Sequence, residues 1–170
     1  MRELSVLDRI GQTPLELLDD VFVKLECSNP FGSVKDRIAR FLLLEAMRRG
    51  DINPGDTVAE ATSGNTGIAL SAVARELGLS AIIFMPEHMS EERVDMIRRL
   101  GAEVRLTPRE ESFAGACARR DALRGTPGVF IPDQFGNPDN ARCHRETTGR
   151  EIIGQITARA VEHVDAFVAG

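Results

Sequence analysis

The sequence lacks the features of a nucleic-acid-binding protein. It contains no tryptophan and no tyrosine, and its eight phenylalanines are scattered along 170 residues. Charged residues make up 28% of the chain, are mixed in sign and sum to a net charge of -5, so no basic stripe forms. Nucleic-acid-binding proteins need such stripes for phosphates and aromatic platforms for bases. We therefore expect no nucleic-acid partner and read the mild acidity as a contribution to solubility.

Cysteine is also scarce, and long apolar runs are missing. Cys27, Cys117 and Cys143 are odd in number and lack CxxC spacing, which argues against a disulfide framework and a zinc site. No uninterrupted apolar stretch approaches the roughly 20 residues of a membrane span. The first residues lack the apolar core of a secretory signal. We expect a cytoplasmic protein with no metal site and no membrane contact.

What the sequence does contain is a regular alternation of strand-like and helix-like segments. Short β-rich or apolar runs predict strands at residues 21–26, 57–61, 81–85, 103–107, 129–131 and 164–168. Helical patterns predict helices at residues 34–49, 68–77, 90–99 and 111–123, and a mostly helical segment at 141–160. This alternation is typical of an α/β fold with three layers, in which helices cover both faces of a parallel sheet.

One stretch, NPFGSVKDR at residues 29–37, places a lysine at the start of a predicted helix. Its Asn-Pro and Gly residues indicate a turn, Ser33 is of a type that caps helices, and an apolar helical run follows. Lys35 therefore falls in the first turn, where the helix dipole disfavours an ammonium. The uncharged amine is the form that attacks an aldehyde. A lone lysine in such a motif is more often an ordinary surface residue.

A second stretch, EATSGNTG at residues 60–67, runs from a predicted strand toward a predicted helix, and its last six residues form a TSGNTG loop. Its glycines and small hydroxyl residues expose successive backbone N–H groups at a helix N-terminus, which suits an anion. The loop is not that of a phosphate-loop NTPase, because no Gly-Lys-Ser/Thr follows, and GxGxxG of a dinucleotide fingerprint is missing. By itself it fits an ordinary glycine-containing turn equally well.

Together, the two stretches resemble the cysteine synthase and cystathionine β-synthase family of pyridoxal-phosphate enzymes, which have fold type II. The resemblance extends to GQTPL at 11–15, MPE at 85–87 and TTGREI at 147–152, and so covers nearly the whole chain in the family's order. It implies three parts. Residues 1–35 would be a flank of a large cofactor domain, residues 36–137 a small αβ domain, and residues 138–170 the start of the remainder of the large domain.

The resemblance also implies roles for particular residues. Lys35 would be the catalytic residue that holds pyridoxal 5'-phosphate and takes the α-proton of the amino acid. The Asn65 amide would contact the cofactor's 3-hydroxyl oxygen. The substrate carboxylate would be bound by Thr62, Ser63, Gly64, Asn65, Thr66 and Gln134. For Gln134, a turn-stabilising role is nearly as good an interpretation.

The three histidines, His88, His144 and His163, are too irregularly spaced for a metal site, and we interpret them as structural. Arg37 is expected to pair with a nearby group. Arg150 stands where Pro is common in the family.

The implied reaction is β-replacement on a serine derivative such as O-acetylserine, in which sulfide or another nucleophile replaces the β-substituent. In the family, the strand predicted at 164–168 leads into a glycine- and threonine-rich loop that binds the cofactor phosphate, and a later Ser faces the pyridine nitrogen. Neither follows here. We therefore expect a fold truncated before the phosphate-binding loop. Its exposed apolar end predicts a homo-oligomer or a complementary C-terminal chain as partner.

Three functional hypotheses remain open. The chain is half of a working synthase whose other half comes from elsewhere, or a catalytically incomplete binding or regulatory module that pairs with a full-length synthase. The third hypothesis is a dehydratase or racemase of the same fold. The TSGNTG and TTG elements favour the synthase.

Overall fold

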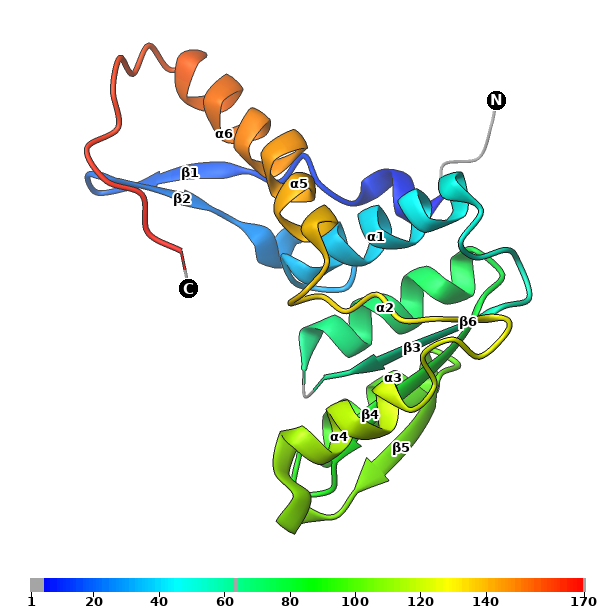
Figure 1. The fold of residues 1–170 in the computed structure, drawn as a ribbon. Coiled ribbons are helices and arrows are strands. Elements are labelled where there is room, and N and C mark those ends of the chain that lie inside the picture. The colour runs from blue at the N-terminus through cyan, green and yellow to red at the C-terminus, as the bar shows by residue number, and fades with distance from the viewer. Residues whose placement is uncertain (1–4, 63, 170) are drawn as a thin grey trace.

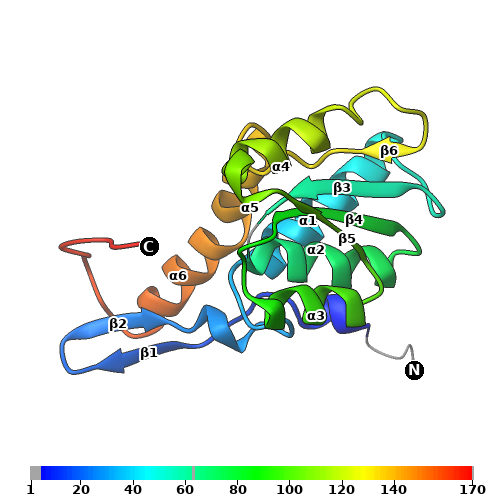
Figure 2. The ribbon, with the colours of Figure 1, turned by 90° about the horizontal axis from the view of Figure 1, so that it is seen from below.

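The computed structural model describes residues 5–62 and 64–169. Its centre is a four-stranded sheet in the order β5-β4-β3-β6, in which every pairing is parallel. The strands are β3 (Thr57–Ala61), β4 (Ser80–Pro86), β5 (Glu103–Thr107) and β6 (Val129–Phe130). Helices α2 (Asn65–Glu76) and α3 (Glu91–Arg99) cover one face, and α4 (Ser112–Asp121) covers the other (Figure 2). The predicted three-layer α/β class is confirmed.

Strand β4 shows why the sheet is buried on both faces. Its side chains alternate between two apolar clusters, because successive residues of a strand point to opposite faces. Ile83 and Met85 lie in the larger cluster, with residues of α2 and α3. Phe84 lies in the smaller cluster, with Ala116 of α4. The continuous apolar run at 81–85 therefore follows from its central place in the sheet.

The remaining elements lie beside this sheet (Figure 1). Helix α1 (Lys35–Arg49) packs on α2, and α5 (Pro138–Glu146) packs on α1. Strands β1 (Leu15–Leu18) and β2 (Val21–Lys24) form a separate antiparallel hairpin, beside which α6 (Thr148–Thr157) lies. The described part of the chain also contains three short 3-10 helices: η1 (Val6–Arg9), η2 (Glu26–Ser28) and η3 (Arg109–Glu111). Strand β1 was not predicted from the sequence.

The segment 141–160 is mostly helical, as expected, although Thr147, with a φ of -117° and a ψ of -81°, divides it into α5 and α6. One prediction about the last part of the chain is wrong. The strand expected at 164–168 is absent from the described residues, where this segment pairs with no other strand. A strand needs a neighbour to bond its backbone N–H and C=O groups, and no strand within residues 5–62 and 64–169 pairs with this segment. Its side chains are exposed, Val168 by 91%.

No helix within residues 5–62 and 64–169 has the length and apolar character that crossing a membrane requires.

Candidate functional site

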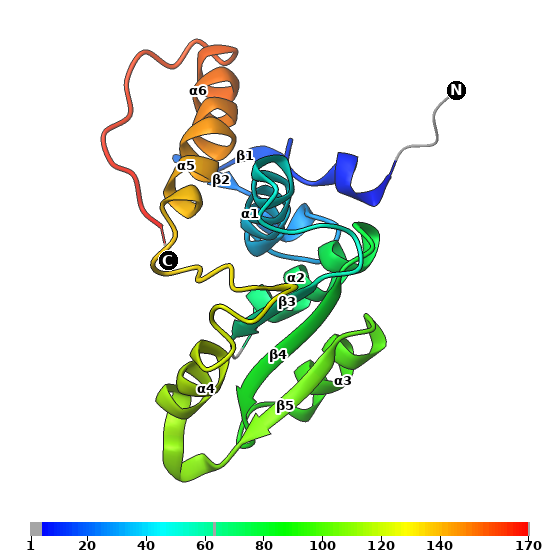
Figure 3. The same cartoon turned by 45° about the vertical axis from the view of Figure 1, so that its right-hand side comes forward.

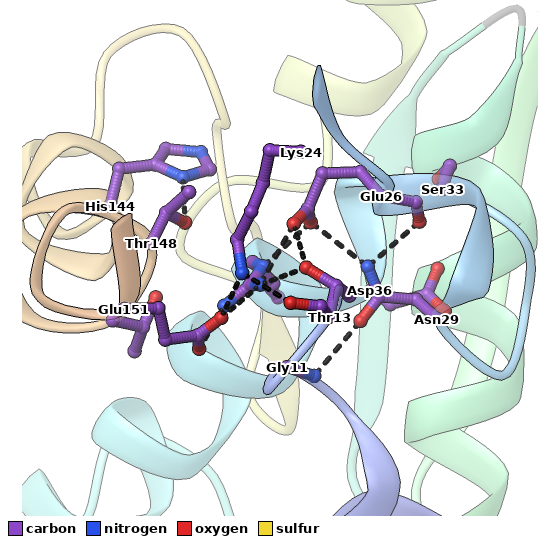
Figure 4. Close-up of polar contacts among 12 residues, drawn as sticks. Gly11, Thr13, Lys24, Glu26, Asn29, Ser33, Asp36, His144, Thr148 and Glu151 are labelled. Carbon is purple, nitrogen blue, oxygen red and sulfur yellow. Dashed lines mark hydrogen bonds and ion pairs between the residues drawn. The ribbon is translucent and has the colours of Figure 1, made fainter. Parts of the chain in front are cut away.

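Lys35 is the first residue of α1, as the sequence predicts, and is half-buried. The cap differs by one position, because Val34 rather than Ser33 is the N-cap residue. The Ser33 hydroxyl oxygen nevertheless accepts a hydrogen bond from the Lys35 N–H at 3.1 Å. The turn before it is tied to the N-terminal segment, since the Gly11 N–H donates to Asn29 Oδ1 at 2.9 Å (Figure 4). Both ends of the turn are thus fixed by side chains.

The Lys35 amine itself makes no hydrogen bond or ion pair within residues 5–62 and 64–169, so it is available to a ligand. The chain contains only one other lysine, Lys24. The Lys24 ammonium is already committed, because it donates to Thr13 O at 2.6 Å and lies 2.8 Å from a Glu151 carboxylate oxygen. Of the two lysine amines, Lys35 is therefore the one free to react.

Asp36 is a fully buried carboxyl beside Lys35. Its Oδ2 accepts a hydrogen bond from the Phe31 N–H at 2.7 Å, which holds the turn from the helix side. Its Oδ1 has no hydrogen-bond partner in the described part of the chain. Burial raises the pKa of Asp36 to about 6, although the backbone hydrogen bonds oppose this.

Arg37 anchors a buried ionic network that fixes the start of α1. The Arg37 side chain, 2% exposed, lies 2.6 Å from Glu26 and 2.6 Å from Glu151. Glu151 is on α6 and also pairs with Lys24 of β2 (Figure 4). Burial acts to raise the pKa of Glu151, but hydrogen bonds from Arg37 and Lys24 outweigh it and lower the pKa to about 2. The expected pairing of Arg37 is confirmed, and it joins the N-terminal hairpin to α1 and α6.

The second predicted stretch lies at the carboxyl end of β3 and the start of α2. Thr62 follows the strand and its N–H donates to Phe84 O at 3.1 Å, while Asn65 is the first residue of the helix. Gly64 is the N-cap residue of α2, and its N–H donates to Thr62 Oγ1 at 3.3 Å. Ser63, also predicted to bind the carboxylate, lies outside the described residues.

Gln134 joins this loop from the segment after β6, the strand next to β3. The Thr66 hydroxyl donates to Gln134 Oε1 at 2.7 Å, and both residues are buried. The Gln134 N–H donates to Glu60 Oε2 at 3.2 Å. The fold therefore brings Gln134 to the TSGNTG loop across 68 residues of sequence. Lys35 comes from α1, and Figure 1 shows the N-terminal ends of α1 and α2 on the same side of the molecule.

His144 was interpreted as a structural residue from its sequence context. It lies on α5, half-buried, with Nδ1 3.0 Å from Thr148 Oγ1 (Figure 4). Burial lowers the pKa of His144, and the charges of Lys35 and Arg37 lower it further. A neutral imidazole is therefore within electrostatic reach of Lys35. The sequence carried no signal for this, because the packing of α5 on α1 creates the proximity.

Two cavities differ in their relation to these residues. The larger, about 660 Å³, lies between residues 10–12, α1 and α6, and neither Lys35 nor the TSGNTG loop lines it. The smaller, about 320 Å³, is formed by residues 134–141 and includes Gln134. The chemistry points to the smaller one, because Gln134 lines it and is hydrogen-bonded to Thr66 of α2. The larger cavity borders the ionic network of Arg37.

The donor set fits a cofactor that carries an aldehyde and an amino-acid substrate that carries a carboxylate. The uncommitted Lys35 amine suits the aldehyde. The N-terminus of α2 suits an anion, because its backbone N–H groups lack partners within the helix. Since Gln134 Oε1 is taken by Thr66, the amide nitrogen of Gln134 is left to donate.

Comparisons with known proteins agree with this chemistry. Residues 6–170 match the family described as pyridoxal-phosphate dependent enzyme. A cysteine synthase from Staphylococcus aureus is 48% identical over 174 residues, covering 98% of this chain and 55% of that protein. The crystal structure of O-ureido-L-serine synthase has a TM-score of 0.85 at 41% identity, covering 91% of this chain and 51% of that one. An O-acetylserine dependent cystathionine β-synthase from Helicobacter pylori has a TM-score of 0.84 at 36% identity, covering 92% and 55%.

This chain therefore spans about half the length of the relatives it matches. The match to residues 6–170 extends over nearly all of it. The chain belongs to the family of pyridoxal-phosphate dependent enzymes.

Proposed function

We propose that this chain carries the half of a β-replacement site that holds the reactive lysine and binds the substrate carboxylate. The substrate would be a serine derivative such as O-acetylserine, and the cofactor pyridoxal 5'-phosphate. One observation carries the proposal: Gln134 is hydrogen-bonded to the TSGNTG loop on the side of the molecule where α1 begins with an uncommitted lysine. The names of the similar proteins, three different synthases, support β-replacement over a dehydratase or racemase.

The chain's own residues have distinct tasks in this proposal. Pyridoxal phosphate supplies the electron sink when bound. The Lys35 amine holds it and moves the α-proton of the substrate, and the Asn65 amide bonds the 3-hydroxyl oxygen. The substrate carboxylate receives hydrogen bonds from the loop of Thr62, Ser63, Gly64 and Thr66 and from the amide nitrogen of Gln134.

We further propose that full activity needs a complementary C-terminal segment, or a second copy of the chain. Support comes from the relatives, of which about half the length is unmatched, and from exposed apolar side chains. Leu17 and Val21 of the hairpin and Phe167 near the end are all more than half exposed. The same surface would serve a regulatory module that pairs with a full-length synthase, which is the second candidate.

We also propose a domain division and a cellular location for the chain. Residues 36–137 would form the small domain, a division supported by the sheet β3–β6, which lies wholly within them. A cytoplasmic location is supported by the three free cysteines, Cys27, Cys117 and Cys143.

The test is to add pyridoxal phosphate to the purified chain, reduce the mixture with borohydride and map the modified residue by mass spectrometry. We expect modification of Lys35 and loss of the visible absorption band in Lys35→Ala. Lys24→Arg is the matched control, because it keeps the charge in the ionic network while removing the other lysine. The visible absorption band should persist in Lys24→Arg.

Addition of O-acetyl-L-serine should then change the spectrum of the wild-type chain. Modification spread equally over Lys24, the N-terminal amine and Lys35 would contradict a built cofactor site. A specific band at Lys35 without any response to O-acetyl-L-serine would favour the regulatory module.

A further inference from the structure

A buried carboxylate lies in the strand that leads into the TSGNTG loop. Glu60, the next-to-last residue of β3, is 0% exposed. Its Oε1 accepts hydrogen bonds from the Ala61 N–H at 2.9 Å and from Arg120 Nη1 at 2.8 Å. Its Oε2 accepts from the Gln134 N–H at 3.2 Å. A carboxylate this deep is costly unless it is paired and hydrogen-bonded, and both conditions are met here.

The partner charge reaches Glu60 from the opposite face of the sheet. Arg120 is on α4, and its side chain is 8% exposed. Besides Glu60, it pairs with Asp121 at 2.9 Å and lies 3.6 Å from an Asp133 carboxylate oxygen. Arg120 therefore contacts both the strand that precedes the TSGNTG loop and the residue that precedes Gln134.

Asp133 and Gln134, at the end of this series of contacts, depend on other parts of the chain for their conformation. Asp133 has a φ of +49°, a left-handed conformation that residues other than glycine seldom adopt. Gln134 follows it, and the Thr66 hydroxyl meets the Gln134 side-chain oxygen at 2.7 Å. The carboxylate of Glu60 fixes the Gln134 backbone, and Arg120 lies against Asp133. These contacts together set the direction of the Gln134 amide.

Stabilisation of the fold does not by itself explain why the Glu60–Arg120 pair is buried. Replacing a buried ion pair by apolar residues of similar volume is often neutral or stabilising. A defined direction for Gln134 is what apolar side chains could not provide, because they offer no acceptor to its N–H.

We propose that the Glu60–Arg120 ion pair is a positioning device, which holds Gln134 so that its amide nitrogen faces the substrate carboxylate at the start of α2. The inference rests on the proposed function and deepens it. Neither residue touches the substrate in this scheme; both act through Gln134.

The first test measures hydrogen exchange of the Gln134 backbone N–H by NMR in the full chain. In Glu60→Gln, the amide oxygen stays with the charged Arg120, and the side-chain NH2 then faces the Gln134 N–H, which loses its acceptor. We expect its exchange to become about tenfold faster or more, the equivalent of one lost hydrogen bond to a charged group. The N–H of Ile83 in central β4 should be unaffected.

Two further variants separate positioning from stability. Arg120→Lys keeps the charge, so its Gln134 N–H exchange rate should be closer to that of wild type than the rate in Glu60→Gln. Arg119→Met is the matched control on the same helix, since the Arg119–Glu111 pair is exposed on both sides. Arg119→Met should leave the exchange rate of the Gln134 N–H unchanged. If Glu60→Gln does not fold, Arg120→Lys is used for the test instead. The Gln134 N–H must then exchange faster in Arg120→Lys than in Arg119→Met.

The second test titrates the chain loaded with pyridoxal phosphate with O-methyl-L-serine, whose methoxide is a poor leaving group. We expect the dissociation constant of this amino acid to rise about tenfold in Glu60→Gln, while cofactor uptake at Lys35 stays the same. An unchanged Gln134 exchange rate in folded Glu60→Gln would overturn the positioning role. Faster exchange with unchanged amino-acid affinity would overturn its link to the carboxylate.

Failure of the proposed function gives a different result. In that case, the wild-type chain would bind neither pyridoxal phosphate nor O-methyl-L-serine. The exchange rates would still decide whether the ion pair fixes Gln134.

Discussion

At the scale of single residues, Gly67 shows how closely the TSGNTG loop is packed. A Cβ built at Gly67 would lie 2.9 Å from Thr62 Cγ2 and 3.0 Å from Ile97 Cδ1. Thr62 and Ile97 are both buried, so neither can move into open space. Only glycine lets α2 begin this close to the strand that precedes it.

Gly67→Ala should therefore lower the free energy of unfolding, by about 1 kcal/mol net. The cost of overpacking, about 1–3 kcal/mol, exceeds the gain of about 1 kcal/mol in helix propensity. Gly154→Ala is the control of opposite sign, because nothing lies within 4 Å of a Cβ at this exposed position of α6. It should raise the free energy of unfolding by about 1 kcal/mol. Urea denaturation measures both, and two changes of the same sign would contradict the packing at Gly67.

At the scale of elements, the ionic network decides where α6 lies. Glu151 connects α6 to Arg37 of α1 and to Lys24 of β2. Gln155, one turn further on, donates to Thr13 O at 2.9 Å. The helix thus holds the hairpin against the helix on which Lys35 stands.

Glu151→Gln should lower the free energy of unfolding at pH 7 by about 2 kcal/mol, because two charged groups lose a charged partner. The folded-state pKa of Glu151, about 2, lies below its usual value of 4.5. The stabilisation is therefore complete above pH 4.5 and lost as the pH falls toward 2. Wild type and variant should converge over that range in urea denaturation. Glu111→Gln, which removes an exposed pair, should have little effect at any pH. Equal stability of wild type and Glu151→Gln at pH 7 would contradict the network's role.

The elements also show what can be predicted from sequence. The apolar run of β4 and the helix that begins at Lys35 are local patterns, and both were predicted within one or two residues. Strand β1 was missed, because Leu15–Leu18 becomes a strand only through its pairing with β2. The strand expected at 164–168 failed for the converse reason, since it has the composition of a strand but no neighbour.

The candidate site divides in the same way. Motifs identified Lys35 and the TSGNTG loop, because these functions are carried by consecutive residues. His144 belongs to no motif, and Glu60 lies in the recognised stretch at 60–67 without a role assigned to it. Their importance depends on what α5 and α4 bring next to them, and this is decided by packing between distant segments.

At the scale of the whole molecule, apolar surface gathers at one end. Figures 1 and 3 place the segment after α6 on the side that carries the hairpin β1–β2, away from β5. Leu17 and Val21 of the hairpin and Phe167 and Val168 of the last segment are all more than half exposed. Exposed apolar side chains gathered on one side of a molecule indicate an interaction site or promote association.

We therefore expect the isolated chain to associate with itself as its concentration rises, with this end buried between copies. Each Å² of apolar surface removed from water contributes about 25 cal/mol, so charges placed there should oppose association. The double variant Leu17→Lys and Val21→Lys should shift the sedimentation coefficient toward that of a monomer. Leu106→Lys on β5, 44% exposed at the far end of the molecule, is the matched control and should leave the association unchanged. A wild-type chain that stays monomeric at every concentration, or a control that dissociates it equally, would contradict the assignment of this end as the interface.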